Sequence, residues 1–152
     1  MKILLVASFG GHFIQLKRLF EQMQNFISEN VTYEFAVTEK DITINGAPAI
    51  YLPNVHRESG LKEKAVSFYN AYKIFKKVKP DVVISTGALP GLIMCFIAKL
   101  FGKKVIWVDS MANYQKLSFS GRIAKFFCSV CLTQWEHLAE NDKRVTYWGK
   151  VL

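Results

Sequence analysis

The sequence predicts a single α/β domain over residues 1–152, built on a parallel β-sheet with helices on both faces. Apolar strands alternate with helical segments along the whole chain, and this alternation is typical of βαβ units. Strands such as 3–7, 82–85 and 105–108 are continuously apolar, as in sheets that are covered on both faces. A length of 152 residues suits one domain with a real core.

In the first half of the chain, two segments carry apolar residues at helical spacing. The predicted elements are strand 3–7, helix 13–27, strand 31–37, an irregular polar segment over 38–48, strand 49–52 and helix 61–78. The apolar face of the first helix consists of Phe13, Leu16, Phe20, Met23 and Ile27. The face of the second consists of Leu61, Ala65, Phe68, Tyr72 and Phe75. We therefore expect both faces to pack on the sheet.

The second half repeats the alternation with shorter elements. The predicted order is strand 82–85, loop 86–91, helix 92–101, strand 105–108, a polar loop from 109, helix 121–127, strand 129–133, a helical turn over 135–140 and strand 145–148. Because the carboxyl ends of parallel strands meet at one edge of the sheet, the loops after 3–7, 82–85 and 105–108 are expected to share a ligand site.

Charge and cysteine content narrow the classes of partner and compartment. The formal net charge of +8 favours an anionic partner: nucleic acid, a phosphorylated substrate or acidic lipid head groups. The chain shows no secretory signal, and the longest uncharged stretch, 82–98, is broken by glycine and proline, so no transmembrane helix is expected. Cys95, Cys128 and Cys131 lie in apolar surroundings without a second ligand pair. We interpret them as core residues in a reducing cytoplasm and predict no metal and no cofactor.

The junction after the first strand is the strongest candidate site. Gly10 and Gly11, which follow Ser8, allow a tight turn that brings backbone N–H groups close to a phosphate at the start of a helix. A neutral imidazole is preferred at a helix start, so His12 is a candidate general base or hydrogen-bond donor. The alternative is a structural strand–helix turn that a polar side chain caps.

Two further pairs of polar residues follow buried strands at the same edge. Thr86 and Gly87 come after strand 82–85, and Asp109 and Ser110 come after strand 105–108. They are candidates to contact a ligand at this edge, but Ser, Thr and Asp are also common helix caps. The lysine-rich helix 61–78 leaves open a solvated face, contact with an anionic membrane surface, or nucleic-acid binding.

Six segments in order resemble a known family. They are residues 8–12, 85–91, 109–113, 117–121, 133–135 and 147–149. Together they are similar to the acceptor-side subunit of the two-part UDP-N-acetylglucosamine transferase of lipid-linked oligosaccharide assembly, which has bacterial relatives in capsule and exopolysaccharide synthesis. The resemblance covers essentially the whole chain. It implies a Rossmann-like domain equivalent to the N-terminal half of a GT-B glycosyltransferase.

The resemblance also implies partners and a location. A separate catalytic subunit would hold the UDP-sugar, and this chain would bind a lipid-pyrophosphate-linked saccharide as a peripheral protein at the cytoplasmic face of the membrane. Ser8, Gly10 and Gly11 would bind the acceptor with His12, Thr86, Gly87, Asp109 and Ser110. Trp148, Val151 and Leu152 would contact the catalytic partner.

Two other functions remain open at this point. A self-sufficient Rossmann-type nucleotide-binding enzyme would use the same glycine turn, but the G-x-G-x-x-G spacing of a dinucleotide site is missing. A nucleic-acid module would use the lysines, but no motif of that class is present, and we expect no nucleic-acid partner.

Overall fold

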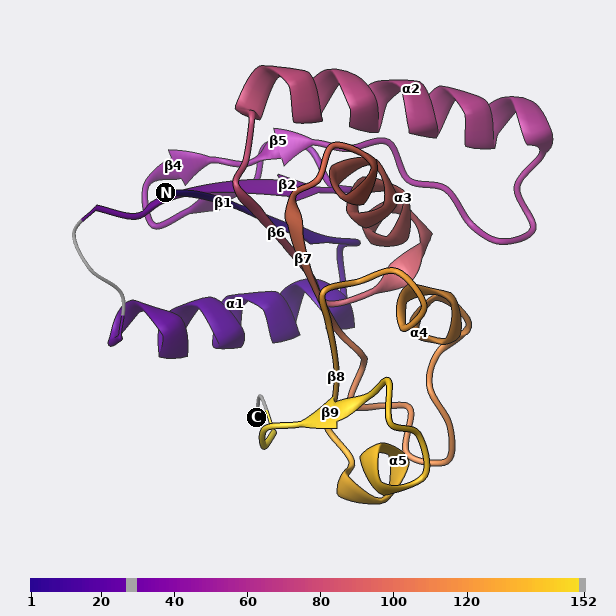
Figure 1. Ribbon diagram of the computed structural model, residues 1–152. Helices are drawn as coiled ribbons and strands as arrows, with labels where there is room; N and C mark the ends of the chain where they lie inside the picture. Colours follow the sequence, from indigo (N-terminus) through magenta and orange to yellow (C-terminus); the bar gives the residue numbers. More distant parts are fainter. Residues whose placement is uncertain (27–29, 151–152) are drawn as a thin grey trace.

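The computed structural model describes residues 1–26 and 30–150, which form one seven-stranded sheet and the helices around it (Figure 1). All strand pairs of this sheet are parallel, in the order β5-β2-β1-β6-β7-β8-β9. The strands are β1 (Lys2–Ala7), β2 (Thr32–Val37), β5 (Ile50–Tyr51), β6 (Val82–Ser85), β7 (Lys104–Val108), β8 (Val130–Thr133) and β9 (Thr146–Tyr147). The predicted parallel sheet is confirmed.

Helices cover both faces of the sheet. They are α1 (Gly11–Gln24), α2 (Leu61–Val78), α3 (Ala88–Leu100), α4 (Phe119–Ala124) and α5 (Glu136–Glu140). Figure 1 shows α1 on one side of the sheet, with α2 and α3 on the other. Each side has its own apolar core, and residues of α1 belong to one core while residues of α2, α3 and α4 belong to the other. Among the described residues, no helix is long and apolar enough to cross a membrane.

Two local predictions differ from the structure. Within the segment predicted as irregular, β3 (Thr43–Ile44) and β4 (Ala47–Pro48) form a small antiparallel hairpin. Its turn residues Asn45 and Gly46 both have positive φ, 50° and 81°, as the Asn-Gly hairpin signal requires. Helix α3 begins at Ala88 instead of residue 92, because proline is tolerated in a first turn, where amides have no intrahelical partner.

The predicted core face of α2 is wrong. The buried residues of α2 are Ser67, Ala71, Ile74, Phe75 and Val78. Only Phe75 of the predicted set is among them, whereas Leu61 is 87% exposed and Phe68 is 40% exposed. Because Ser67 and Ala71 are small, this stripe of α2 can pack closely against α3, whereas Phe68, Tyr69 and Tyr72 remain partly exposed. For the first helix, Ile27 lies outside the described residues.

The cysteines lie as expected. Cys95 and Cys131 are buried in the core, and Cys128 packs against it half-buried. Burial raises the pKa of the Cys131 thiol to about 12 and raises that of Cys95 as well. These two thiols are therefore protonated and apolar in character at neutral pH, and their predicted role as core residues is confirmed.

Candidate functional site

The site lies where the strand order reverses. Strands β1 and β6 are neighbours at the centre of the sheet, with Val6 opposite Ser85. The next strand after β1, β2, lies on one side of this pair, and the next strand after β6, β7, lies on the other. The loops that follow them therefore meet at the carboxyl edge, the position at which open α/β sheets bind ligands. The structure thus brings Gly10, Gly11 and His12 next to Thr86 and Gly87, as the sequence predicts.

Two hydrogen bonds hold His12 against the loop after β6. The His12 Nδ1 atom lies 2.9 Å from the carbonyl oxygen of Thr86, which can only accept, so Nδ1 carries the proton and donates. The Thr86 hydroxyl in turn donates to the His12 carbonyl oxygen at 2.7 Å. The Nε2 atom of the neutral ring is then a free acceptor, and it has no hydrogen-bond partner among the described residues. Thr86 therefore positions His12.

Gly87 and the pair Gly10–Gly11 are glycines for different structural reasons. A Cβ atom at Gly87 would lie 2.3 Å from His12 Nδ1, and its φ of +142° is strained for other residues, so glycine is required there. Gly10 also needs its positive φ of +106°, but a Cβ atom at Gly10 or Gly11 would meet nothing within 4 Å. Open space therefore lies beside the turn at the start of α1.

A cavity of about 250 Å³ adjoins His12. Its walls come from four separate parts of the chain: His12 of α1, His56 and Arg57 of the segment after β5, Leu89 of α3, and Phe119 of α4. The cavity combines imidazole and guanidinium groups with apolar surface, and the Glu58 carboxylate also lines it. Arg57 is the group of this lining that can pair with an anionic part of a ligand.

Arg57 is the site residue that the sequence reasoning missed. Its guanidinium carbon lies 4.4 Å from the centroid of the Phe119 ring, a cation–π contact that orients the group at the cavity. No described carboxylate lies within 4 Å of it, so its charge is available to a ligand. A sequence signal for Arg57 exists, because His56 and Arg57 follow predicted strand 49–52 at the carboxyl edge of the sheet.

Asp109, a predicted ligand contact, points into the protein interior. Its side chain is buried and accepts hydrogen bonds from Trp107 Nε1 at 3.1 Å, the Ser118 amide at 2.8 Å, the Ser118 hydroxyl at 2.5 Å and Asn113 Nδ2 at 3.3 Å. A Cβ atom at Gly121 would lie 2.4 Å from Asp109 Oδ1. The carboxylate therefore organises residues 109–118 and the start of α4.

Ser110 and Ser8 also lie apart from the His12 cavity lining. The Ser110 hydroxyl is buried and accepts a hydrogen bond from Gln15 Nε2 of α1 at 3.3 Å. Gln134 Nε2 donates to Gln15 Oε1 at 3.3 Å, which joins this network to the segment after β8. Ser8 is half-buried at the end of β1. A ligand contact for either serine stays a prediction.

A second hollow, of about 200 Å³, lies near the carboxyl end of the described chain. Leu19 and Gln22 of α1, Leu132 of β8 and Trp148 line part of it. Trp148 is 70% exposed, and its contact with a catalytic partner stays a prediction. Val151 and Leu152, the other two predicted interface residues, lie outside the described residues.

Comparison with protein families and curated proteins gives concordant results. A family model described as "Oligosaccharide biosynthesis protein Alg14 like" matches residues 56–151, more than half of the chain. The chain is 27% identical over 172 residues to the "UDP-N-acetylglucosamine transferase subunit ALG14" of Yarrowia lipolytica, covering 97% of this chain and 80% of the relative. The mouse protein of the same name is 25% identical over 182 residues, covering 100% of this chain and 83% of the relative.

Solved structures share the fold at low sequence identity. MurG of Acinetobacter baumannii aligns with a TM-score of 0.65 at 15% identity, over 88% of this chain and 42% of that chain. The S. aureus MnaA–UDP co-structure aligns with a TM-score of 0.72 at 12% identity, over 99% of this chain and 45% of that chain. The chain thus spans less than half the length of these proteins. The predicted Rossmann-like fold, equivalent to one half of a GT-B glycosyltransferase, is confirmed.

Proposed function

Because the chain belongs to the Alg14-like family of oligosaccharide biosynthesis proteins, we propose that it is the acceptor-binding subunit of a split GT-B glycosyltransferase. A catalytic partner subunit holds the UDP-sugar. The two chains together transfer the sugar to a lipid-pyrophosphate-linked saccharide at the cytoplasmic face of the membrane, in capsule or exopolysaccharide synthesis. Support comes from the curated relatives, which are named as UDP-N-acetylglucosamine transferase subunits.

The observation that carries this proposal is the cavity at the reversal of the strand order. On one side, the turn at Gly10 and Gly11 has open space beside it and stands at the start of the long helix α1, where amide groups favour an anion. On another side, the Arg57 guanidinium has no carboxylate partner among the described residues. The amide donors that precede His12 lie next to the cavity and the Arg57 guanidinium lines it, so together they would bind the two phosphates of the acceptor.

His12 acts as the general base in this proposal. Thr86 fixes the tautomer in which Nδ1 is protonated and Nε2 accepts. The attacking acceptor hydroxyl forms a bond to the sugar carbon that carries the nucleotide and gives its proton to His12 Nε2. The bond between that carbon and the pyrophosphate oxygen breaks, and UDP leaves with the electron pair. The Thr86 carbonyl stabilises the imidazolium that forms.

The test uses the protein in its complex. The tagged chain is isolated from detergent-solubilised native cells with its co-purifying subunit, and transfer from radiolabelled UDP-N-acetylglucosamine to extracted lipid is measured. We expect His12→Ala to lower the transfer rate at least about 100-fold, the usual contribution of a general base, without loss of the partner. The matched control is His137→Ala, because His137 lies on α5 outside the cavity.

Two results would contradict the proposal. Unchanged transfer by the His12→Ala complex removes the general-base role. A chain that purifies without a partner and binds UDP saturably by itself belongs instead to a self-sufficient nucleotide-binding enzyme.

A further inference from the structure

An apolar groove of about 200 Å³ lies between α2, α3 and the α4 segment. Its lining side chains are all apolar: Phe68, Leu92, Ile93, Phe96, Ile123 and Phe127. Leu92 is buried at its floor, whereas Phe68, Phe96 and Ile123 are each about 40% exposed at its rim. A solvent-exposed groove without polar lining marks a binding surface for apolar matter.

The groove continues from the His12 cavity along two shared helices. On α3, Leu89 lines the cavity, and Ile93, four residues on and on the same helix face, lines the groove. On α4, Phe119 and Ile123 have the same relation. From Leu89 to Phe96 the helix rises about 10 Å, which is comparable to a short prenyl chain. Polar cavity and apolar groove therefore form one track.

The positive charge available to a ligand lies at the cavity end of this track. Arg57 and Arg122 lie 4.4 and 5.9 Å from the Phe119 centroid, and neither has a described carboxylate within 4 Å. The track thus has a cationic end and an apolar body.

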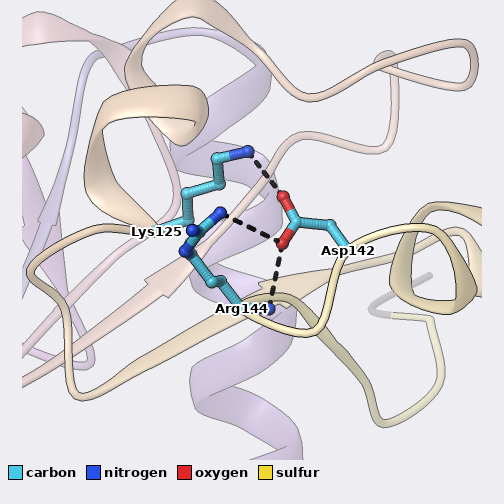
Figure 2. Close-up of polar contacts among 3 residues, drawn as sticks. All are labelled: Lys125, Asp142 and Arg144. Atoms are coloured by element: carbon cyan, nitrogen blue, oxygen red, sulfur yellow. Dashed lines mark hydrogen bonds and ion pairs between the residues drawn. The ribbon is translucent and has the colours of Figure 1, made fainter.

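At the far end of α4, two cations share one carboxylate. Figure 2 shows the Lys125 and Arg144 side chains both directed at the Asp142 carboxylate. Lys125 Nζ lies 2.5 Å from Asp142 Oδ2, and Arg144 Nη1 lies 3.9 Å from Oδ1, which also accepts the Arg144 amide. The hydrogen bond from Lys125 lowers the pKa of Asp142, so the carboxylate stays charged at neutral pH and offsets one of the two positive charges. An anionic head group is therefore favoured at the Arg57 end.

We propose that the groove binds the first isoprene units of the acceptor lipid while its pyrophosphate lies in the His12 cavity. The inference rests on the proposed function and assigns a subsite to the ligand's apolar part. An isoprenoid diphosphate has the required order of groups: an anionic head followed directly by an apolar chain. Burial of that chain against Phe96 and Ile123 adds affinity that a free pyrophosphate lacks.

The test compares two probes on the full chain by calorimetry: farnesyl diphosphate and inorganic pyrophosphate. We expect the wild type to bind farnesyl diphosphate at least tenfold more tightly. The variants Phe96→Ser and Ile123→Ser should lose most of this preference and bind inorganic pyrophosphate as the wild type does. Both residues are partly exposed, so the variants should fold, which thermal unfolding checks. The matched control is Phe26→Ser, because Phe26 is 89% exposed and follows α1.

Each other outcome overturns the inference and separates it from the proposed function. Equal affinity of the wild type for both probes, or an unchanged preference in the groove variants, overturns the lipid subsite alone. If the variants keep the preference but lose binding to phosphatidylglycerol vesicles, the groove contacts the bilayer instead of the acceptor chain. If the wild type binds neither diphosphate, the pyrophosphate site itself is absent, and the proposed function fails together with the subsite.

Discussion

The two sides of the carboxyl edge differ in what their polar groups contact. In the segment 109–118, the buried Asp109 carboxylate accepts four hydrogen bonds from neighbouring groups of the same fold. Beside the His12 cavity, His12 Nε2 has no hydrogen-bond partner among the described residues. No described carboxylate lies within 4 Å of the Arg57 guanidinium nitrogens. A polar group with a full set of internal partners shapes a site, whereas one without partners is available to bind.

The largest effect on stability is expected at Asp109. Asp109→Ala leaves the Trp107 indole and the Ser118 amide buried without an acceptor, and unmade hydrogen bonds to a charged group are costly. We expect the free energy of unfolding in urea to fall by about 3 kcal/mol. Glu21→Ala, on the exposed surface of α1, is the control and should change it by less than about 0.5 kcal/mol. A loss as small as the control's would show that the carboxylate does not organise this edge.

Periodicity predicts the elements of this fold better than it predicts which face of a helix is buried. The bounds of α2, Leu61–Val78, follow from the sequence, but two stripes on that helix carry apolar residues. The buried stripe is the one with Ser67 and Ala71, because small side chains allow close approach to α3. The spacing of apolar residues within α2 does not predict this close packing, because the packing depends on α3, which lies elsewhere in the sequence.

The site was predictable where a glycine pattern follows a strand, and not elsewhere. Gly10 and Thr86 lie at loops whose position follows from two buried parallel strands. Arg57 lies in a segment without regular structure, and its place at the cavity depends on Phe119, which is far away in the chain. Asp109 follows a strand in the same way as Thr86 does. Sequence therefore cannot tell whether its carboxylate faces a ligand or the interior.

A smaller effect on stability is expected at Gly87, which lies directly against the His12 ring. Gly87→Ala places a Cβ atom 2.3 Å from His12 Nδ1 at a φ of +142°, so the backbone is strained and the imidazole must move. We expect the free energy of unfolding to fall by about 2 kcal/mol, with a matching loss of sugar transfer by the complex. Gly60→Ala is the control, because Gly60 has open space and a φ of −64°. Wild-type stability and transfer in Gly87→Ala would contradict the contact with His12.

The smallest effect on stability is expected at Arg57, where stability and ligand binding should respond most differently to one substitution. Arg57 is exposed and its side chain contacts the Phe119 ring, so Arg57→Ala should change the free energy of unfolding by less than about 0.5 kcal/mol. The same change should weaken the binding of inorganic pyrophosphate about tenfold in calorimetry, because a charge-assisted hydrogen bond is lost. Arg57→Lys should restore part of this affinity, since the charge returns without the planar fork.

Arg18→Ala is the matched control for Arg57, because Arg18 is an exposed arginine of α1 that does not line the His12 cavity. It should leave both the stability and the pyrophosphate affinity unchanged. The decisive contrary result is an Arg57→Ala protein that unfolds more readily but binds pyrophosphate as before. Arg57 would then belong with Asp109 among the groups that shape the edge. The absence of a carboxylate beside a cation would no longer identify the ligand-binding side of this fold.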